Sequence, residues 1–391
     1  KIDVANMLTG VTPVANGGTA LSSGFKNSVE RPNDKPLIIN GNMNVWQRST
    51  STVTMSDGYY NVDRFRGEEN TAGSATWSRS TSVPDDTDFP FSLQVDCTGT
   101  DTSLASSDKC VLQHTIEAQN IAKHTKWGTS NAEKLTLSFW VKSNQTGQHS
   151  VGLRKLDNTN YNQPKTYTIS SADTWEQKIL VFSALTSTGG AITEDNGDGL
   201  QIFWGLTTGS GYQGTADTWT QTNEGAIAVS GDVNFLSSTD NNFYLTGVQL
   251  EIGEYTSSTL PAFEHESFAD NLARCQRYYQ KPVYSKDYQG TTEEYGAFNT
   301  GTYSADAYFR VARPLGVEMR TNPTLSSSSG TNYFFILSGA NDDINDVTLH
   351  NDSNFKTVWV YNNDEASSTA GQAGILMANN TSAYIAFDAE L

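Results

Sequence analysis

The sequence of 391 residues is long enough for two or three domains that each bury a core of their own. Only 36% of the residues are apolar, but 8 Trp, 17 Tyr and 17 Phe supply large rings, and the many small polar residues favour strands and turns over long helices. A formal net charge of −18 argues against a nucleic-acid partner, and the absence of an apolar run of about 18 residues argues against insertion into a membrane.

The first 35 residues are predicted to form an extended connector or stalk. Residues 10–20 consist of small side chains with Pro13 and the adjacent Gly17 and Gly18 among them. So little apolar surface cannot offset the cost of ordering the backbone. The tract is therefore either a flexible tether or a segment that becomes ordered only against other chains.

Residues 36–266 are predicted to form one jelly-roll β-sandwich. Apolar side chains alternate with polar ones at residues 135–141 and 200–206, which is the period of a strand with one buried face. Many short strands at even spacing, separated by Gly-, Asn- and Asp-rich turns, favour an antiparallel sandwich. Further strands are predicted at residues 92–97, 151–156, 166–169, 177–182 and 242–251.

A linking helix is predicted for residues 267–282. Phe268, Leu272, Cys275 and Tyr279 fall on one face at helical spacing, Ser267 is a suitable N-cap, and a proline at 282 stops the helix. Residues 283–391 are then predicted to form a second, smaller β-sandwich, with strands at 307–311, 333–337, 355–360 and 382–388.

The sequence has three cysteines, too few for a disulfide framework. Cys97 and Cys110 flank one polar loop, so they either form a single disulfide or remain reduced thiols.

Sequence signatures of catalysis are missing. The histidines lack the spacing of a zinc site, and neither a nucleophile elbow nor a phosphate-binding loop occurs. We therefore predict no catalytic residue, no metal ligand and no cofactor. Residues 195–199 offer oxygen ligands for calcium, but they lack the spacing of an EF-hand loop and are interpreted as a turn.

A glycosidase remains an alternative because glycoside cleavage needs only two carboxylates at a defined separation. Acidic residues near predicted strand ends are Glu176, Glu194, Asp195, Glu251 and Glu264. With 43 acidic residues in the chain, chance proximity is expected, and a non-catalytic binding protein is the favoured interpretation.

Aromatic residues in polar loops give the main functional signal, because sugar rings stack on aromatic faces while polar neighbours bond the hydroxyls. One loop combines Tyr212, Gln213, Asp217 and Trp219, and Tyr161 belongs to a smaller set. These five residues are the predicted glycan-binding residues. In the alternative interpretation, Trp219 folds back as a lid on the core.

Several motifs together resemble a carbohydrate-binding-like jelly-roll domain of phage tail fibres and related virion proteins, including those of marine cyanobacterial phages. The resemblance covers residues 37–281, and residues 11–19 are similar to connectors of fibre shafts. The motifs are LIINGNMNVWQR at 37–48, YNVDRF at 60–65, LTLSFWVK at 135–142, FYLTGVQLE at 243–251, PAFEH at 261–265 and CQRYY at 275–279.

The resemblance implies a homotrimer in a virion tail fibre, joined to other tail proteins through its N-terminal side and acting outside the cell. It implies that the protein attaches to a host surface glycan and does not catalyse a reaction on it. A tail-spike depolymerase and a purely structural virion adaptor or decoration protein remain alternatives. Related modules often hold a structural calcium with an Asp of the last strand, where this chain has Thr246 and Gly247. The Asp63 and Arg64 pair is interpreted as framework that ties strands together.

Overall fold

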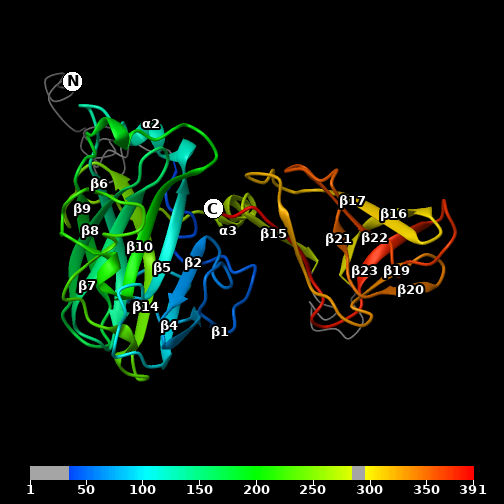
Figure 1. The fold of residues 1–391 in the computed structure, drawn as a ribbon, viewed down its shortest axis with the longest axis horizontal. Coiled ribbons are helices and arrows are strands. Elements are labelled where there is room, and N and C mark those ends of the chain that lie inside the picture. Colours follow the sequence, from blue (N-terminus) through cyan, green and yellow to red (C-terminus); the bar gives the residue numbers. More distant parts are fainter. Residues whose placement is uncertain (1–34, 284–295) are drawn as a thin grey trace, which may run out of the picture. The chain divides into compact units, whose positions relative to one another are not determined.

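The computed structural model describes residues 35–283 and 296–391 (Figure 1). The predicted connector, apart from Lys35, lies outside these residues. The chain forms two compact units. The first contains Ser49–Glu266 together with the residues up to Asn44, and the second contains Val45–Arg48 and Ser267–Leu391. Strands dominate both units, so the predicted mainly β class is confirmed.

The first unit is a jelly-roll-like sandwich of two six-stranded antiparallel sheets. Sheet 1 has the order β1-β3-β4-β14-β6-β9, and sheet 2 has the order β12-β8-β7-β10-β5-β2. The strands of sheet 1 are β1 (Val53–Thr54), β3 (Ser74–Ser80), β4 (Ser92–Gly99), β6 (Leu135–Ser143), β9 (Glu176–Phe182) and β14 (Asn242–Ile252). Those of sheet 2 are β2 (Phe65–Asn70), β5 (Lys109–Glu117), β7 (Gly147–Lys155), β8 (Tyr161–Ile169), β10 (Asp198–Thr208) and β12 (Thr220–Gln221).

Aromatic side chains join the two sheets of the first unit. Phe139 of β6 lies edge-on to Trp204 of β10 and to Tyr167 of β8, with ring centroids 5.9 and 5.2 Å apart. Phe65 of β2 reaches the same Trp204 at 6.1 Å. Because each large ring buries roughly 150–250 Å², a few aromatic residues build the core of a chain that is poor in aliphatic ones.

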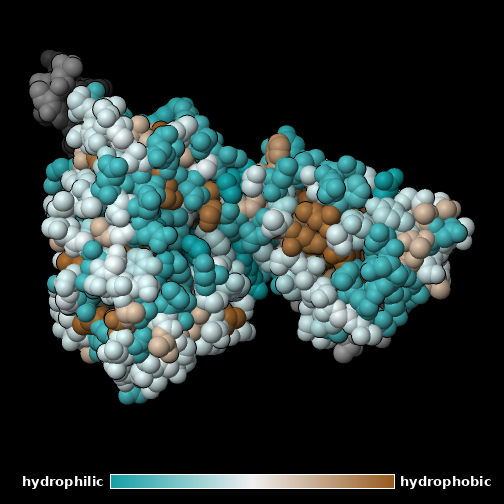
Figure 2. All heavy atoms as spheres, viewed as in Figure 1, coloured by the Kyte–Doolittle hydropathy of each residue, from teal (hydrophilic) through white to brown (hydrophobic). Residues whose placement is uncertain are grey.

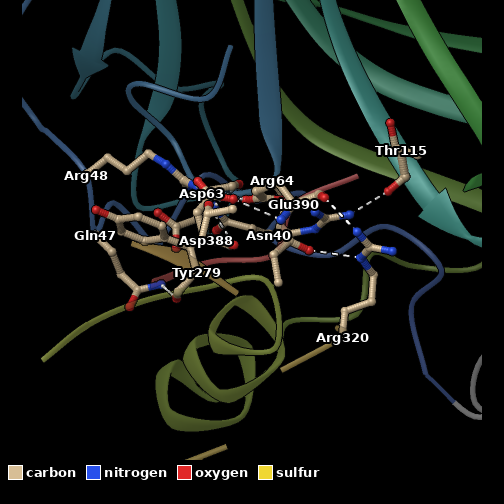
Figure 3. Close-up of polar contacts among 12 residues, drawn as sticks. Asn40, Gln47, Arg48, Asp63, Arg64, Thr115, Tyr279, Arg320, Asp388 and Glu390 are labelled. Carbon is tan, nitrogen blue, oxygen red and sulfur yellow. Dashed lines mark hydrogen bonds and ion pairs between the residues drawn. The ribbon is translucent and has the colours of Figure 1, made fainter. Parts of the chain in front are cut away.

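A buried arginine ties the entrance of β2 to β5. Arg64 has a left-handed backbone, with φ of 72°, and its side chain is fully buried. Its Nη2 donates to the carbonyl of Thr115 at 2.6 Å, and Asn40 Nδ2 donates to the carbonyl of Asp63 at 3.0 Å (Figure 3). These contacts support the interpretation of Asp63 and Arg64 as framework.

The second unit contains sheet 3, with the order β15-β24-β18, and sheet 4, with the order β20-β19-β23-β16-β17-β22-β21. Its core gathers Phe298, Tyr303, Phe309 and Phe387. Sheet 3 consists of β15 (Tyr279–Val283), β18 (Thr324–Ser327) and β24 (Ile385–Asp388). Sheet 4 consists of β16 (Ala297–Ala305), β17 (Tyr308–Pro314), β19 (Phe334–Leu337), β20 (Asn341–Ile344), β21 (Thr348–Leu349), β22 (Thr357–Asn362) and β23 (Ala373–Ala378).

The predicted helix is shorter than its sequence pattern suggests. Helix α3 (Phe268–Gln276) begins as predicted, with Ser267 Oγ accepting from the backbone N–H of Asp270 at 3.1 Å. The chain leaves the helix before Tyr279 because residues 279–283 pair with β24 as strand β15. A register shift between Gln280 and Val283 accommodates the proline at 282.

Two other sequence interpretations are settled by the structure. Strand β8 begins at Tyr161, so Tyr161 belongs to a strand and not to a loop. Cys97 and Cys110 are buried free thiols, as is Cys275. Burial raises the pKa of the Cys110 thiol well above its usual value. Its Sγ contacts Met55 Sδ at 3.9 Å.

Residues 45–48 contribute a charged anchor to the second unit. Arg48 lies 3.7 Å above the ring of Tyr279 and pairs with Asp388 at 3.0 Å and Glu390 at 3.3 Å (Figure 3). Its side chain is 6% exposed. Gln47 Nε2 donates to the carbonyl of Tyr279 at 2.9 Å. This short segment therefore belongs to the second unit, although the sequence on both sides of it belongs to the first.

We predict that Arg48→Gln destabilises the second unit by about 3 kcal/mol, because it removes the cation that pairs with the buried Glu390 and the half-buried Asp388. When urea unfolding is followed by hydrogen exchange, peptides of β17 and β22 should unfold at a lower urea concentration in Arg48→Gln than in wild type. Arg79→Gln is the control, since Arg79 is exposed on β3 of the first unit. Equal unfolding midpoints in wild type and Arg48→Gln would contradict the role of Arg48 as an anchor.

A neutral histidine lies in the core of the first unit. His149 of β7 is 3% exposed, stacks on Tyr167 at 5.5 Å, and donates from Nε2 to the carbonyl of Gln145 at 3.2 Å. Burial lowers the pKa of His149 to about 4; the carbonyl of Gln145 opposes the shift, and the charge of Lys178 adds to it. The unfolded chain therefore takes up a proton at a higher pH than the folded one.

The first unit should accordingly lose stability as the pH falls from about 6.5 to about 4, by about 3 kcal/mol from His149 alone. Above pH 6.5 the histidine is neutral in both the folded and the unfolded state, so its full contribution to the stability of the first unit is present. Urea titrations of wild type and His149→Phe at several pH values measure this difference. Identical pH dependence in the two proteins would show that His149 does not carry it.

Candidate functional site

The five predicted glycan-binding residues fall into two places on the first unit. Tyr212 and Gln213 lie where the turn of residues 210–212 meets the short strand β11 (Gln213–Gly214). Tyr161 begins β8, and Asp217 and Trp219 lie in the segment just before the edge strand β12, which pairs with β8.

Tyr212 and Gln213 are engaged in packing. The Tyr212 ring covers a small apolar cluster of Val111, Phe203 and Ile227, and Lys109 Nζ lies 4.7 Å from its centre. Gln213 Nε2 donates to the carbonyl of Thr208 at 3.0 Å. Both side chains are half-buried. The Tyr212 ring and the Gln213 amide therefore hold the loop to sheet 2.

The second group forms what we call the Trp219 rim, defined as Tyr161, Lys165, Asp217 and Trp219. The Trp219 ring stands edge-on to Trp127, with centroids 5.2 Å apart, and its Nε1 donates to the carbonyl of Ser183 at 2.9 Å. Trp127 is buried, whereas Trp219 is half-buried. Two contacts thus fix the orientation of a ring that keeps part of its surface open to solvent.

Charged and hydroxyl groups flank Trp219. Asp217, in a left-handed conformation with φ of 61°, forms an ion pair with Lys165 and is 65% exposed at its carboxylate side chain. The carbonyl of Asp217 accepts from Gln163 Nε2 at 2.9 Å. Tyr161 Oη lies 3.0 Å from Ser187 Oγ. Burial lowers the pKa of Lys165.

A buried lysine holds the turns behind the rim. Lys155 Nζ donates to the carbonyls of Thr159 and Gly189, both at 3.1 Å, and to that of Asp157. The hairpin between β7 and β8 is thereby tied to the turn of Thr188–Gly190. Burial lowers the pKa of Lys155, and the charge of Asp157 opposes that shift. The ammonium serves as a fixed bridge between backbone carbonyls.

Sequence reasoning missed Lys165 as a rim residue. The signal was present, because Tyr161, Gln163 and Lys165 alternate along β8 and so point to the same side of the strand. Both Gln163 and Trp219 contact Ser183, through its hydroxyl at 2.6 Å and its carbonyl at 2.9 Å respectively. The interpretations of Trp219 as a lid and as a sugar platform are compatible, since the ring packs on Trp127 and yet stays only half-buried.

Two of the acidic residues considered for a glycosidase, Glu176 and Glu194, are held by other groups. Burial alone would raise the pKa of Glu176, but hydrogen bonds from Lys178, Ser171 and Ser170 outweigh it and lower that pKa. Glu194 pairs with Lys123 at 2.5 Å. A general acid needs a raised pKa, so Glu176 is poorly suited to that role.

The described ranges 35–283 and 296–391 hold no group of three or more His, Cys, Asp or Glu side chains placed to bind a metal ion. In the Asp195 turn, the carboxylate Oδ1 accepts from the backbone N–H of Gly197 at 2.8 Å.

Helices within the same ranges are too short or too polar to cross a bilayer. Figure 2 shows a largely hydrophilic visible surface on which apolar residues form small patches.

No family model matches the chain, and no curated protein matches it. Among solved structures, the tailspike protein 4 enzymatically active domain of bacteriophage CBA120 is 14% identical over 56% of this chain, with a TM-score of 0.28. The match spans only 21% of that domain. A putative sugar binding protein from Bacteroides thetaiotaomicron is 13% identical over 56% of this chain and 100% of its own, with a TM-score of 0.28.

A family 11 carbohydrate-binding module from Clostridium thermocellum is 12% identical over 56% of this chain and 99% of its own, with a TM-score of 0.25. At these identities and TM-scores we draw no conclusion about the ligand of this chain from its neighbours. The chemistry of its own side chains has to carry the functional proposal.

Proposed function

We propose that this protein attaches to a cell-surface glycan through the Trp219 rim and does not transform it. One observation carries the proposal: Trp219 is oriented by Trp127 and Ser183 while part of its ring faces solvent beside Asp217. A ring fixed in this way stacks on the C–H face of a sugar with little loss of conformational freedom.

The polar groups of the rim suit sugar hydroxyls. The Asp217 carboxylate accepts hydrogen bonds, Lys165 donates them, and the Tyr161 hydroxyl does both. Their positions on strand β8 and on the segment before β12 place them along one edge of the sandwich, a surface along which a chain of sugars can lie. Such a surface recognises a polymer without enclosing it.

We further propose a role as a virion tail-fibre protein that acts outside the cell as a homotrimer. The support is the likeness of residues 37–281 to jelly-roll domains of phage fibres, together with the connector motif at 11–19. Three copies on one stalk would raise the effective concentration of each further contact, so weak sites would give firm attachment. Other tail proteins would join through the N-terminal side.

Trp219→Ala should weaken glycan binding by about tenfold or more, because truncation of an aromatic hot spot costs about 2 kcal/mol or more and each 1.4 kcal/mol is about tenfold in affinity. The measurement is a glycan-array screen of the full chain, followed by calorimetry with the best oligosaccharide. Tyr60→Ala is the matched control, since Tyr60 is a 47% exposed aromatic residue of the first unit outside the rim.

Unchanged affinity in folded Trp219→Ala would refute the rim as the binding site. Absence of any glycan ligand for the wild-type chain would favour a structural virion part. Shortening of the bound polysaccharide during incubation, read by size-exclusion chromatography, would contradict non-catalytic binding and favour a depolymerase.

Native mass spectrometry of the full 391-residue chain should show three times the mass of one chain at micromolar concentration. A variant without residues 1–34 is expected to give a lower oligomer, because the proposal assigns trimer contacts to the connector. A monomeric full chain would contradict the homotrimer.

A further inference from the structure

The second unit carries a row of half-buried aromatic residues on the solvent side of sheet 4. In β22, Val358 and Val360 are fully buried, whereas Trp359 and Tyr361 keep part of their rings exposed. Strand alternation therefore places both large rings on the side opposite the core. Neighbouring large rings on an open sheet face are a candidate binding surface.

The neighbouring strand β17 completes this surface. Arg310 is directly opposite Tyr361 in the antiparallel register, so the two side chains share a face. Tyr308 lies on the same side of β17, and its ring stacks on Tyr361 with centroids 5.4 Å apart and planes inclined by 26°. We call Tyr308, Arg310, Trp359 and Tyr361 the Tyr361 platform.

Hydroxyl groups extend the platform at both ends of one row. Thr302 of β16 is opposite Arg310, and Thr348 of β21 is opposite Tyr361. Both threonines are exposed. The row across four strands thus reads hydroxyl, guanidinium, phenol ring, hydroxyl, with a second aromatic ring at Trp359, about 6.6 Å further along β22.

Arg310 gives the platform a positive charge. Its guanidinium is exposed and lies 5.9 Å from the centre of the Trp359 ring. Within the described parts of the chain it has no ion pair, although the chain has 43 acidic and only 25 basic residues.

Two acids near the ends of β22 and β21, Asp352 and Glu318, already have partners. At the edge of the platform, His350 packs edge-on to Tyr361 at 5.7 Å, and its Nδ1 lies 3.4 Å from Asp352. Glu318 pairs with Lys356 at 2.8 Å. The platform therefore offers an available cation next to aromatic faces.

We propose that the Tyr361 platform binds an acidic polysaccharide whose sugar units carry carboxylates, such as a uronic-acid polymer. The C–H face of a uronate ring stacks on Tyr361 or Trp359, and its carboxylate forms charge-assisted hydrogen bonds with Arg310. The threonine hydroxyls bond the ring hydroxyls. A neutral sugar gains the stacking and loses the charged contact, so the platform discriminates by charge.

This inference stands apart from the Trp219 rim, because its residues all belong to the second unit. The proposals for the rim and for the platform can therefore be disproved independently. Trp219→Ala is expected to leave uronate binding unchanged, and variants of the platform are expected to leave the ligand of the rim unaffected.

The experiment titrates the full chain with oligogalacturonate and, in parallel, with a neutral galactose oligosaccharide of equal length, using calorimetry. Wild type should bind the acidic probe at least tenfold more tightly, and added salt should reduce the difference. Arg310→Gln should bring the acidic probe down to the affinity of the neutral one. Trp359→Ala should weaken both probes.

The control is Leu337→Ala, which removes a 41% exposed apolar side chain from β19, separated from β17 by β23 and β16. It should bind like wild type, and thermal unfolding should confirm that all variants fold. The inference would be overturned by equal wild-type affinity for the acidic and neutral probes, or by an Arg310→Gln variant that binds like wild type. It would also be overturned if the wild type bound neither oligogalacturonate nor a second acidic probe, oligomannuronate.

Discussion

The alternation of side chains along a strand is the constraint on which both units depend. Every second residue must enter the core, so only the remaining positions are available to a ligand. In β10, Trp204 enters the core, while Phe203 on the other face packs with Val111 and Ile227. In β22 the valines fill the core and the rings are left outside. Core formation and surface chemistry are therefore specified by interleaved residues of the same segments.

This constraint explains why much of the fold could be read from the sequence. The strands at residues 135–141 and 200–206 show alternation within a few neighbouring residues, and both are present as β6 and β10. The start of α3 depends on Ser267 and the next three residues, so a local pattern identified it. The end of α3 could not be predicted from the local sequence, because the pairing of β15 with β24 depends on residues more than a hundred positions away.

The candidate site was harder to foresee for the same reason. The composition of the loop pointed to Trp219, but what the ring touches depends on Ser183, 36 residues earlier, and on Trp127. Tyr212 looked equivalent in the sequence, and only the pairing of sheet 2 shows that it covers Val111 and Phe203. Local sequence identifies aromatic residues, whereas sheet register decides which of them keep an open face.

The segment of residues 45–48 has a consequence for how this protein can be inherited and engineered. Since Arg48 is built into the second unit while its neighbours in sequence belong to the first, no single cut separates two complete units. A recombination event or truncation at residue 266 would transfer the second unit without Arg48, the cation that pairs with Asp388 and Glu390. We therefore expect exchange among related proteins to favour junctions before residue 35, which would transfer both units together.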